Sequence, residues 1–355
     1  MTPLSKQVGA ATEAHLFIVN SSVTLQITRS VIEHLGLQKD QVIVLAGRRF
    51  HGRLVSQFDH VWDLDTGEVP TVPLAARFWV RKAALTKFDS YVKQRTMGRT
   101  FRVYLPHTIL PLYQLLATHP SCVGFSYIEE GIVAYRPNSE VKNCIPAMIP
   151  NLSGIQKWVM RGRWDMEWPF DKRAEAAYGF SSSSFSTIGV PVVVQEPNWS
   201  VSSDLAKRYD HSVLCILGPA RTLVKSSWNP EQYYWMIMQL AEILVHTDRK
   251  IFVRFHPDQK DDERRLILRL FNEKIPGAEV ASDEDQAEAI CASADVVIVQ
   301  AGSSVGLYAD QLGKPVYGYL DLMQEIAPRA VQSWVDTRSQ MSYSFRERDI
   351  RTFGN

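Results

Sequence analysis

Short runs of apolar residues alternate with longer amphipathic stretches along most of the chain. Residues 15–20 (HLFIVN) form the first apolar run. Residues 24–36 then place apolar side chains at helical spacing until a glycine ends the pattern. A second apolar run follows at residues 41–47 (QVIVLAG). A strand, a helix and a second strand at this spacing predict a βαβ unit and therefore a parallel sheet.

The same alternation returns after residue 100. The pattern predicts further strands within residues 101–106, 122–131 and 189–195, and from residue 211 onward strands and helices alternate regularly. We therefore expect two domains, residues 1–200 and residues 201–355, with the boundary between about residues 196 and 210. The polar residues 333–350 are expected to pack back across the first domain.

Two such halves predict an α/β protein with two doubly wound, Rossmann-like domains that face each other across a crevice. Ligands of doubly wound sheets bind outside the carboxyl ends of the parallel strands. Sugar-nucleotide transferases, epimerases and binding proteins all use this architecture, so the fold does not give the function. The polar residues that follow the predicted strands are the candidates for chemistry.

Composition narrows the setting of this chemistry. The chain has 355 residues, of which 45% are hydrophobic, and its net charge of +1 gives no reason to expect a nucleic-acid partner. The four cysteines lack metal-ligand spacing, and Cys215 and Cys291 lie in apolar runs, which predicts buried thiols in a reducing, cytoplasmic compartment. We recognise no secretory signal, and no apolar stretch reaches the ~20 residues of a membrane span.

The first candidate follows the predicted strand that begins at residue 122. Glu129 and Glu130 stand at its end, and Gly131 turns the chain. A carboxylate at a strand end can accept a proton from an attacking hydroxyl. The alternative is that both are solvated glutamates in a turn.

The second candidate is His256, which ends the predicted strand of residues 251–255 and precedes Pro257. Proline lacks a backbone donor and has a fixed φ, so the strand must end there. An imidazole in this place can donate a proton or a hydrogen bond to a departing phosphate. The alternative is a strand-end histidine capped by Asp258 or Asp261.

The third candidate is Gly302-Ser303-Ser304, which opens a predicted helix. Free N–H groups at a helix start, with serine hydroxyls beside them, form an anion site. The alternative is a plain helix cap. Ser282 and Glu284 follow another strand and could bind a nucleoside, or they could cap and charge the next helix.

Three short motifs resemble, in their order along the chain, those of the bacterial sialyltransferases of glycosyltransferase-B architecture. They are Glu129-Glu130-Gly131, His256-Pro257 and Ser303-Ser304. In that family the acidic motif belongs to the N-terminal domain and the other two belong to the C-terminal domain. This sequence keeps the same division.

The resemblance implies a role for each matching residue. One of Glu129 and Glu130 would be the general base on the acceptor hydroxyl, and the sequence does not tell which. His256 would be the general acid, or would stabilise charge, at the departing CMP phosphate. The donor nucleotide would be bound by Pro257, Ser282, Glu284, Gly302, Ser303 and Ser304. Further substrate contacts are expected from Asn20, Ser21, Ser22 and Arg221, for which an ordinary cap and a surface arginine are the alternatives.

The implied reaction is a single inverting displacement without a metal or other cofactor. It would move sialic acid or a related nonulosonate from a CMP-sugar donor to a glycan acceptor, in capsule or lipooligosaccharide synthesis. The protein would work in the cytoplasm, with or without peripheral contact with the cytoplasmic face of the inner membrane. A CMP-Kdo transferase, a UDP-sugar transferase or epimerase, and a non-catalytic binding protein remain as alternatives.

Overall fold

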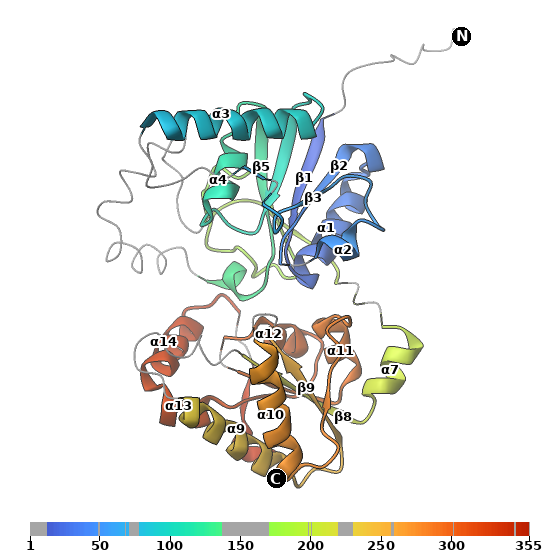
Figure 1. The fold of residues 1–355 in the computed structure, drawn as a ribbon, viewed down its shortest axis with the longest axis vertical. Coiled ribbons are helices and arrows are strands. Elements are labelled where there is room, and N and C mark those ends of the chain that lie inside the picture. Colours follow the sequence, from blue (N-terminus) through green and yellow to red (C-terminus); the bar gives the residue numbers. More distant parts are fainter. Residues whose placement is uncertain are drawn as a thin grey trace. The chain divides into compact units, whose positions relative to one another are not determined.

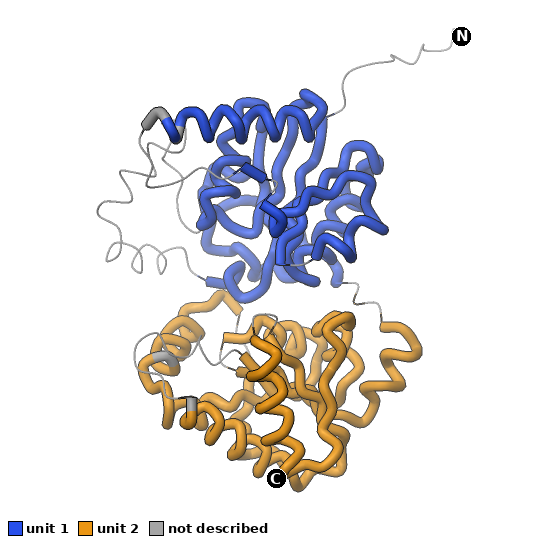
Figure 2. The backbone as a smooth tube through the Cα atoms, viewed as in Figure 1, with its two compact units in different colours: residues 1–197 blue, residues 198–355 orange. Residues whose placement is uncertain are grey.

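The computed structural model describes residues 13–48, 50–67, 69–70, 78–136, 170–197, 199, 201–218, 230–256, 259–300, 302–343 and 346–354. The chain divides into two compact units, residues 1–197 and residues 198–355, which Figure 2 colours separately. The expected division lay between residues 200 and 201. Figure 1 labels many of the helices and strands of both units.

Unit 1 is built around a parallel sheet with short helices and turns between its strands. Its described strands are β1 (Ala14–Val19), β2 (Val42–Ala46), β3 (Val61–Asp63), β4 (Phe101–Leu105), β5 (Cys122–Ile128), β6 (Ala177–Gly179) and β7 (Val192–Val194). Its described helices are α1 (Ser22–Leu35), α2 (His51–Leu54), α3 (Phe78–Arg95), α4 (Pro111–Ala117) and the 3-10 turns η1 (Lys39–Gln41) and η2 (Ile132–Tyr135).

The strands of unit 1 pair in parallel in the order β3-β2-β1-β4-β5-β6-β7. All six residues of β1 are buried, which explains its unbroken apolar sequence, because central strands of parallel sheets are covered on both faces. The direction in which successive strands are added reverses between β1 and β4. This is the topological switch point, where ligands of doubly wound sheets bind.

Unit 2 repeats this plan. Its described strands are β8 (Ser212–Leu217), β9 (Lys250–Phe255), β10 (Glu279–Val280), β11 (Val296–Val299), β12 (Val316–Gly318) and β13 (Arg348–Asp349). Its described helices are α7 (Ser203–Tyr209), α9 (Pro230–Leu244), α10 (Asp261–Lys274), α11 (Ala287–Ser293), α12 (Ser304–Gln311), α13 (Leu320–Ile326), α14 (Pro328–Ser339) and the 3-10 turn η3 (Ile350–Thr352).

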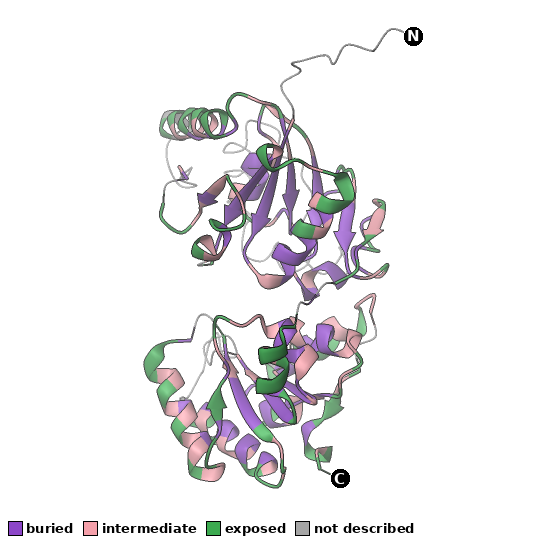
Figure 3. Ribbon diagram, turned by 90° about the vertical axis from the view of Figure 1, so that its right-hand side faces the viewer, coloured by how far each residue is buried: buried purple, intermediate pink, exposed green. Residues whose placement is uncertain are grey.

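The strands of unit 2 pair in parallel in the order β10-β9-β8-β11-β12-β13, and the reversal lies between β8 and β11. The central strands of both sheets are buried, as the purple arrows of Figure 3 show. Cys215 on β8 and Cys291 on α11 are fully buried free thiols, which confirms the expectation for both.

The expected pair of parallel α/β domains is confirmed, with three differences in detail. The sequence patterns gave no sign of α3 or of the short strands β3 and β6. The expectation that residues 333–350 pack back across the first domain stays a prediction, and their described part belongs to unit 2. They end α14, whose Val331 and Trp334 are buried, and they form β13, which pairs with β12. None of the described helices is long and apolar enough to cross a bilayer.

Candidate active site

Four polar side chains gather around the switch point of unit 1. Arg48 follows β2, Asn20 follows β1, His107 follows β4 and Glu130 follows β5. These four strands are consecutive neighbours in the sheet, so their carboxyl ends lie side by side. Together with Tyr113 on α4, these residues form what we call the Glu130 cluster.

Glu130 lies at the centre of this cluster. Its Oε1 accepts a hydrogen bond from Asn20 Nδ2 at 2.8 Å and lies 3.3 Å from Arg48 Nη1, while its Oε2 lies 3.6 Å from His107 Nε2. The Glu130 side chain is only 10% exposed. Burial raises the pKa of Glu130, and Arg48 and the Asn20 hydrogen bond oppose that shift. A carboxylate with a raised proton affinity is suited to act as a general base.

His107 presents an N–H group to this carboxylate. Its Nδ1 accepts a hydrogen bond from the backbone N–H of Ile109 at 3.2 Å, which places the ring hydrogen on Nε2, the atom that faces Glu130. Burial and the charge of Arg48 lower the pKa of His107 to about 4. The two side chains are within ion-pair distance, but both pKa shifts disfavour the charged forms. We therefore interpret the contact as a neutral imidazole that presents its Nε2 to the carboxyl group of Glu130, and not as an ion pair.

Tyr113 and Arg48 complete the cluster. The Tyr113 hydroxyl lies 3.5 Å from Asn20 Nδ2, and its ring centroid lies 5.2 Å from that of His107. Arg48 has a φ of 51°, in the left-handed region that residues with a side chain seldom adopt, and its side chain is 67% exposed. Strained backbone of this kind recurs at functional sites. Arg48 thus adds a solvent-facing positive charge to the cluster.

Glu129 has a different environment from Glu130. It is fully buried, and its carboxylate accepts hydrogen bonds from Tyr135 Oη at 2.9 Å, the backbone N–H of Phe180 at 2.9 Å and Ser184 Oγ at 2.7 Å. These contacts join β5 to the segments after it. Glu129 is therefore enclosed by hydrogen bonds from its own unit, and Glu130 is the carboxylate that the cluster surrounds. Gly131, with a φ of 118°, turns the chain as expected.

The three polar residues after β1 have separate roles. Ser21 caps α1, because its Oγ accepts from the backbone N–H of Thr24 at 3.1 Å, so the ordinary cap is correct for Ser21. Ser22 is the first residue of α1. Asn20 belongs to the cluster. Only Asn20 of the three is placed beside the candidate base.

In unit 2, His256 follows β9 directly, as expected. Its backbone N–H donates to the carbonyl of Leu217 at 3.1 Å and to Gln259 Oε1 at 2.7 Å. Its carbonyl accepts from Arg264 Nη2 at 3.2 Å. His256 is an exposed residue whose backbone is held on both sides, which suits a ring that meets a ligand.

Ser282 and Glu284 lie after β10. The hydroxyl of Ser282 accepts from the backbone N–H of Glu284 at 3.2 Å, and Glu284 is exposed. Neither caps the next helix, because α11 begins at Ala287 with Gln286 in the cap position. Asp283, between them, pairs with Arg264 at 2.7 Å.

Gly302, Ser303 and Ser304 form the start of α12, after β11. Gly302 has a φ of 81°, which favours glycine. Ser303 occupies the cap position, but its side chain makes no capping hydrogen bond. The plain cap proposed as the alternative is therefore absent, and the helix start keeps its N–H groups beside two partly buried serines.

These residues of unit 2 follow β9, β10 and β11, which lie within four consecutive strands of the sheet. Because β8 alone separates β9 from β11, and adjacent strands lie about 4.8 Å apart, the ends of β9 and β11 are roughly 10 Å apart. Two expected contacts, Pro257 and Arg221, lie outside the described residues. In the described parts of both units, no group of three or more His, Cys, Asp or Glu side chains is arranged to hold a metal ion.

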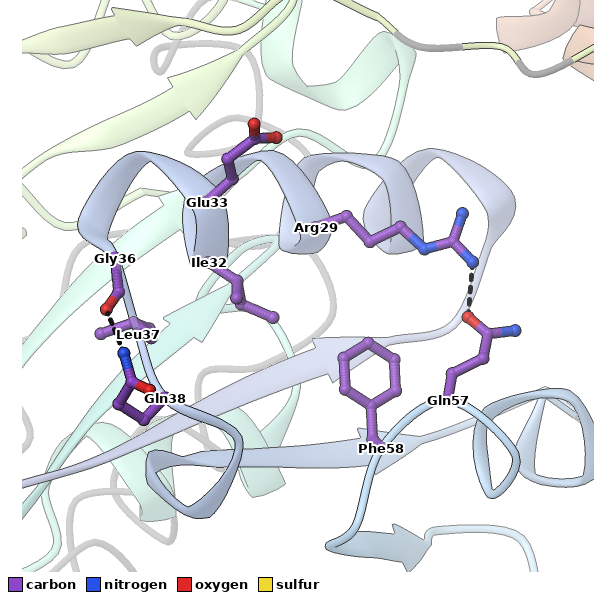
Figure 4. A pocket seen from close by; sticks show the side chains of 8 residues that line it. All are labelled: Arg29, Ile32, Glu33, Gly36, Leu37, Gln38, Gln57 and Phe58. Carbon is purple, nitrogen blue, oxygen red and sulfur yellow. Dashed lines mark hydrogen bonds between the residues drawn. The ribbon is translucent and has the colours of Figure 1, made fainter.

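A surface pocket of about 590 Å³ lies elsewhere in unit 1, between α1 and the residues after α2 (Figure 4). Arg29 and Gln57 are hydrogen-bonded across it at 2.5 Å. It reaches Gly36 at the far end of α1, whereas Asn20 precedes the start of that helix. The strand-end side chains of the Glu130 cluster lie at the other end of α1 from this pocket.

Sequence reasoning missed His107, Tyr113 and Arg48. His107 and Arg48 each come directly after a run that was predicted to be a strand, so the strand-end rule would have found both. Tyr113 carried no such signal, because it lies inside a helix pattern.

The chain shares its fold with sugar-nucleotide enzymes. No protein-family model and no curated protein matches it. A UDP-bound structure of S. aureus MnaA is 12% identical, has a TM-score of 0.53 and matches over 97% of this chain and 93% of that one. A sialyltransferase from Photobacterium damsela is 12% identical, has a TM-score of 0.51 and matches over 91% and 79%. The calicheamicin glycosyltransferase CalG4 is 13% identical, has a TM-score of 0.50 and matches over 92% of this chain and 84% of that one.

Proposed function

We propose that this protein is an inverting glycosyltransferase that moves sialic acid, or a related nonulosonate, from a CMP-sugar to a hydroxyl group of a glycan. The observation that carries the proposal is the Glu130 cluster. It places one carboxylate of raised pKa between an amide donor and a neutral imidazole, at the switch point of a doubly wound sheet. The fold shared with glycosyltransferases supports the class.

Unit 1 would supply the base. The acceptor hydroxyl gives its proton to Glu130 while its oxygen attacks the anomeric carbon of the donor sugar. Asn20 donates a hydrogen bond to one carboxylate oxygen and His107 lies 3.6 Å from the other, so the proton acceptor would be oriented before the substrate arrives. The bond from the anomeric carbon to the phosphate oxygen breaks in the same step, which inverts the configuration.

Unit 2 would hold the donor. The phosphate of CMP binds the N–H groups at the start of α12 and the hydroxyls of Ser303 and Ser304. His256, after β9, donates a proton or a hydrogen bond to this phosphate as it departs. Ser282 and Glu284 would contact the nucleoside. The roughly 10 Å between the ends of β9 and β11 is compatible with one nucleotide that meets both.

The test is a melting-temperature titration of the full chain with CMP, CDP, UMP, UDP and GDP, followed by turnover with CMP-sugars. A ligand that binds only the folded state raises the melting temperature by mass action. We expect stabilisation by CMP alone, and a release of CMP during turnover that Glu130→Gln lowers by about 10²- to 10⁴-fold. Glu33→Gln, in the pocket of Figure 4, is the matched control and should keep full activity.

Other outcomes would identify the alternatives. Stabilisation by UDP and not by CMP would overturn the CMP-sugar proposal and favour a UDP-sugar enzyme. CMP binding without turnover of any CMP-sugar would favour a binding protein. Turnover of CMP-Kdo and not of CMP-sialic acid would keep the mechanism and change the sugar.

A further inference from the structure

The segment that follows α14 carries a buried carboxylate, which is linked through α14 to the candidate anion site of unit 2. Glu347 lies just before β13, the strand that pairs with β12. Its side chain is only 4% exposed. The carboxylate lies against the backbone of Gly318, the last residue of β12, where a Cβ atom on residue 318 would coincide with it. Glycine at this position therefore makes room for the acid.

The two oxygens of Glu347 have different surroundings. Oε2 accepts a hydrogen bond from Arg338 Nη1, on α14, at 2.9 Å. Oε1 is buried and has no hydrogen-bond partner within the described part of the chain. An unsatisfied buried oxygen on a carboxylate lowers stability, so the residue is poorly explained by stability alone.

Helix α14 connects Glu347 to the start of α12. Trp334 precedes Arg338 by one helical turn, so both side chains lie on the same face of α14. The benzene part of the Trp334 ring packs on Gly302, because a Cβ there would lie 3.7 Å from Cε3 of Trp334. Trp334 is 7% exposed. One face of α14 therefore makes two contacts. Its Trp334 contacts the start of α12, and its Arg338 contacts Glu347.

The other end of α12 is held by the residues just before Glu347. Asp310, near the end of α12, accepts a hydrogen bond from Tyr343 Oη at 2.9 Å and another from the backbone N–H of Arg346 at 3.3 Å. The segment that carries Glu347 thus contacts the C-terminal end of α12 directly, and it is linked to the start of α12 through α14. Figure 1 labels both helices.

We propose that Glu347 is a positioning residue for the anion site at the start of α12: it fixes α14 through Arg338, and α14 fixes Gly302 through Trp334. The conformation of Gly302 determines where the N–H groups of the helix start point. The identity of the anion as the donor phosphate rests on the proposed function. The mechanical link between Glu347 and Gly302 does not.

The link is expected to respond to pH, because only the ionised carboxylate holds Arg338 with full charge. Burial raises the pKa of Glu347 to about 7, against the opposing effect of Arg338. Among the titratable and charged groups, Arg338 on α14 donates a hydrogen bond to it and Tyr319, after β12, lies near it, while Arg346 and Arg348 stand beside it in the sequence. Protonation near neutral pH would weaken the hold on α14 and on Gly302.

The first experiment needs no ligand. Hydrogen exchange of the full chain is followed by mass spectrometry in peptides that cover residues 302–311, at about pH 6 and about pH 8, with correction for intrinsic rates. Glu347→Gln should raise exchange at pH 8 by about 3- to 10-fold and remove the difference between the two pH values. Glu325→Gln, which breaks the exposed pair with Arg351, is the matched control. Equal exchange in the wild type and Glu347→Gln at both pH values would overturn the proposal.

The second experiment asks whether the link serves the ligand. The affinity for CMP is measured at both pH values for the wild type and for Glu347→Gln. The ratio of the two affinities at each pH cancels the effect of the titration of the phosphate itself, whose pKa is about 6. Glu347→Gln should bind about 3- to 10-fold more weakly at pH 8, with kcat little changed, and should approach the wild type at pH 6. An equal ratio at both pH values would overturn the role in binding. If CMP binds neither protein, the proposed function fails, and the exchange data still decide the link.

Discussion

Replacing Glu347 by glutamine is expected to raise the global free energy of unfolding of unit 2 at alkaline pH, although losing the ion pair with Arg338 loosens α14 and the start of α12 locally. Burial raises the pKa of Glu347 from 4.5 to about 7. The folded state therefore binds its proton more tightly than the unfolded state does, and the free energy of unfolding falls as pH rises from about 4.5 to about 7. At about 1.4 kcal/mol per pKa unit, this difference corresponds to about 3 kcal/mol.

Glutamine keeps the shape of the acid and stays neutral. The variant should match the wild type near pH 4.5 and be up to about 3 kcal/mol more stable near pH 8. Cys215 and Cys291, which are fully buried in unit 2, provide the assay. Their labelling by a thiol reagent in increasing urea, read peptide by peptide, reports the unfolding of unit 2 separately from that of unit 1.

Two results would refute this reasoning. A wild-type protein whose unit 2 is equally stable at both pH values would show that Glu347 is not held protonated. A variant that is less stable than the wild type at pH 8 would show that the pairing with Arg338 outweighs the effect of burial. Glu325→Gln, at an exposed pair, should leave the pH dependence unchanged.

Three further predictions concern unit 1. Glu130→Gln should lower kcat/KM by about 10²- to 10⁴-fold in a CMP-release assay, without a fall in melting temperature, and retained activity would remove Glu130 from the mechanism. The activity of the wild type should fall with acidification at a pH above the usual pKa of glutamate, because burial raises the pKa of Glu130. Arg48→Ala should move this acidic limb of the pH–activity profile to higher pH, since Arg48 lowers the pKa of Glu130. Gly179→Ala should destabilise unit 1 by about 1–3 kcal/mol in urea denaturation, because its Cβ would lie 2.5 Å from Cβ of Ser184; unchanged stability would show that the neighbouring backbone yields freely.

The strands could be predicted from the sequence because burial on both faces leaves an unbroken apolar run, as in β1 and β8. Sheet order could not, because pairing joins residues far apart in the chain. Asn20 and Glu130 are 110 positions apart, and only the order β1-β4-β5 makes them neighbours. This explains why Glu129 and Glu130 could not be told apart before the structure was seen.

The residues of the C-terminal segment were hidden for a related reason. Strand β13 has two residues, both exposed, and therefore no alternating pattern. The burial of Glu347 depends on Gly318, which lies 29 positions earlier and offers no side chain. Nothing in the local sequence around residue 347 distinguishes a buried acid from a solvated one.

The position of β13 also bears on how unit 2 is made on the ribosome. The chain is synthesised from its N-terminus, so β12 emerges well before residues 348–349, which cover its open edge. Until then β12 presents unpaired N–H and C=O groups, a template for pairing with other chains. A chain truncated before residue 346 would lack β13 and would keep the edge of β12 exposed permanently. Its sheet would therefore be prone to aggregate, whether or not the active site had formed.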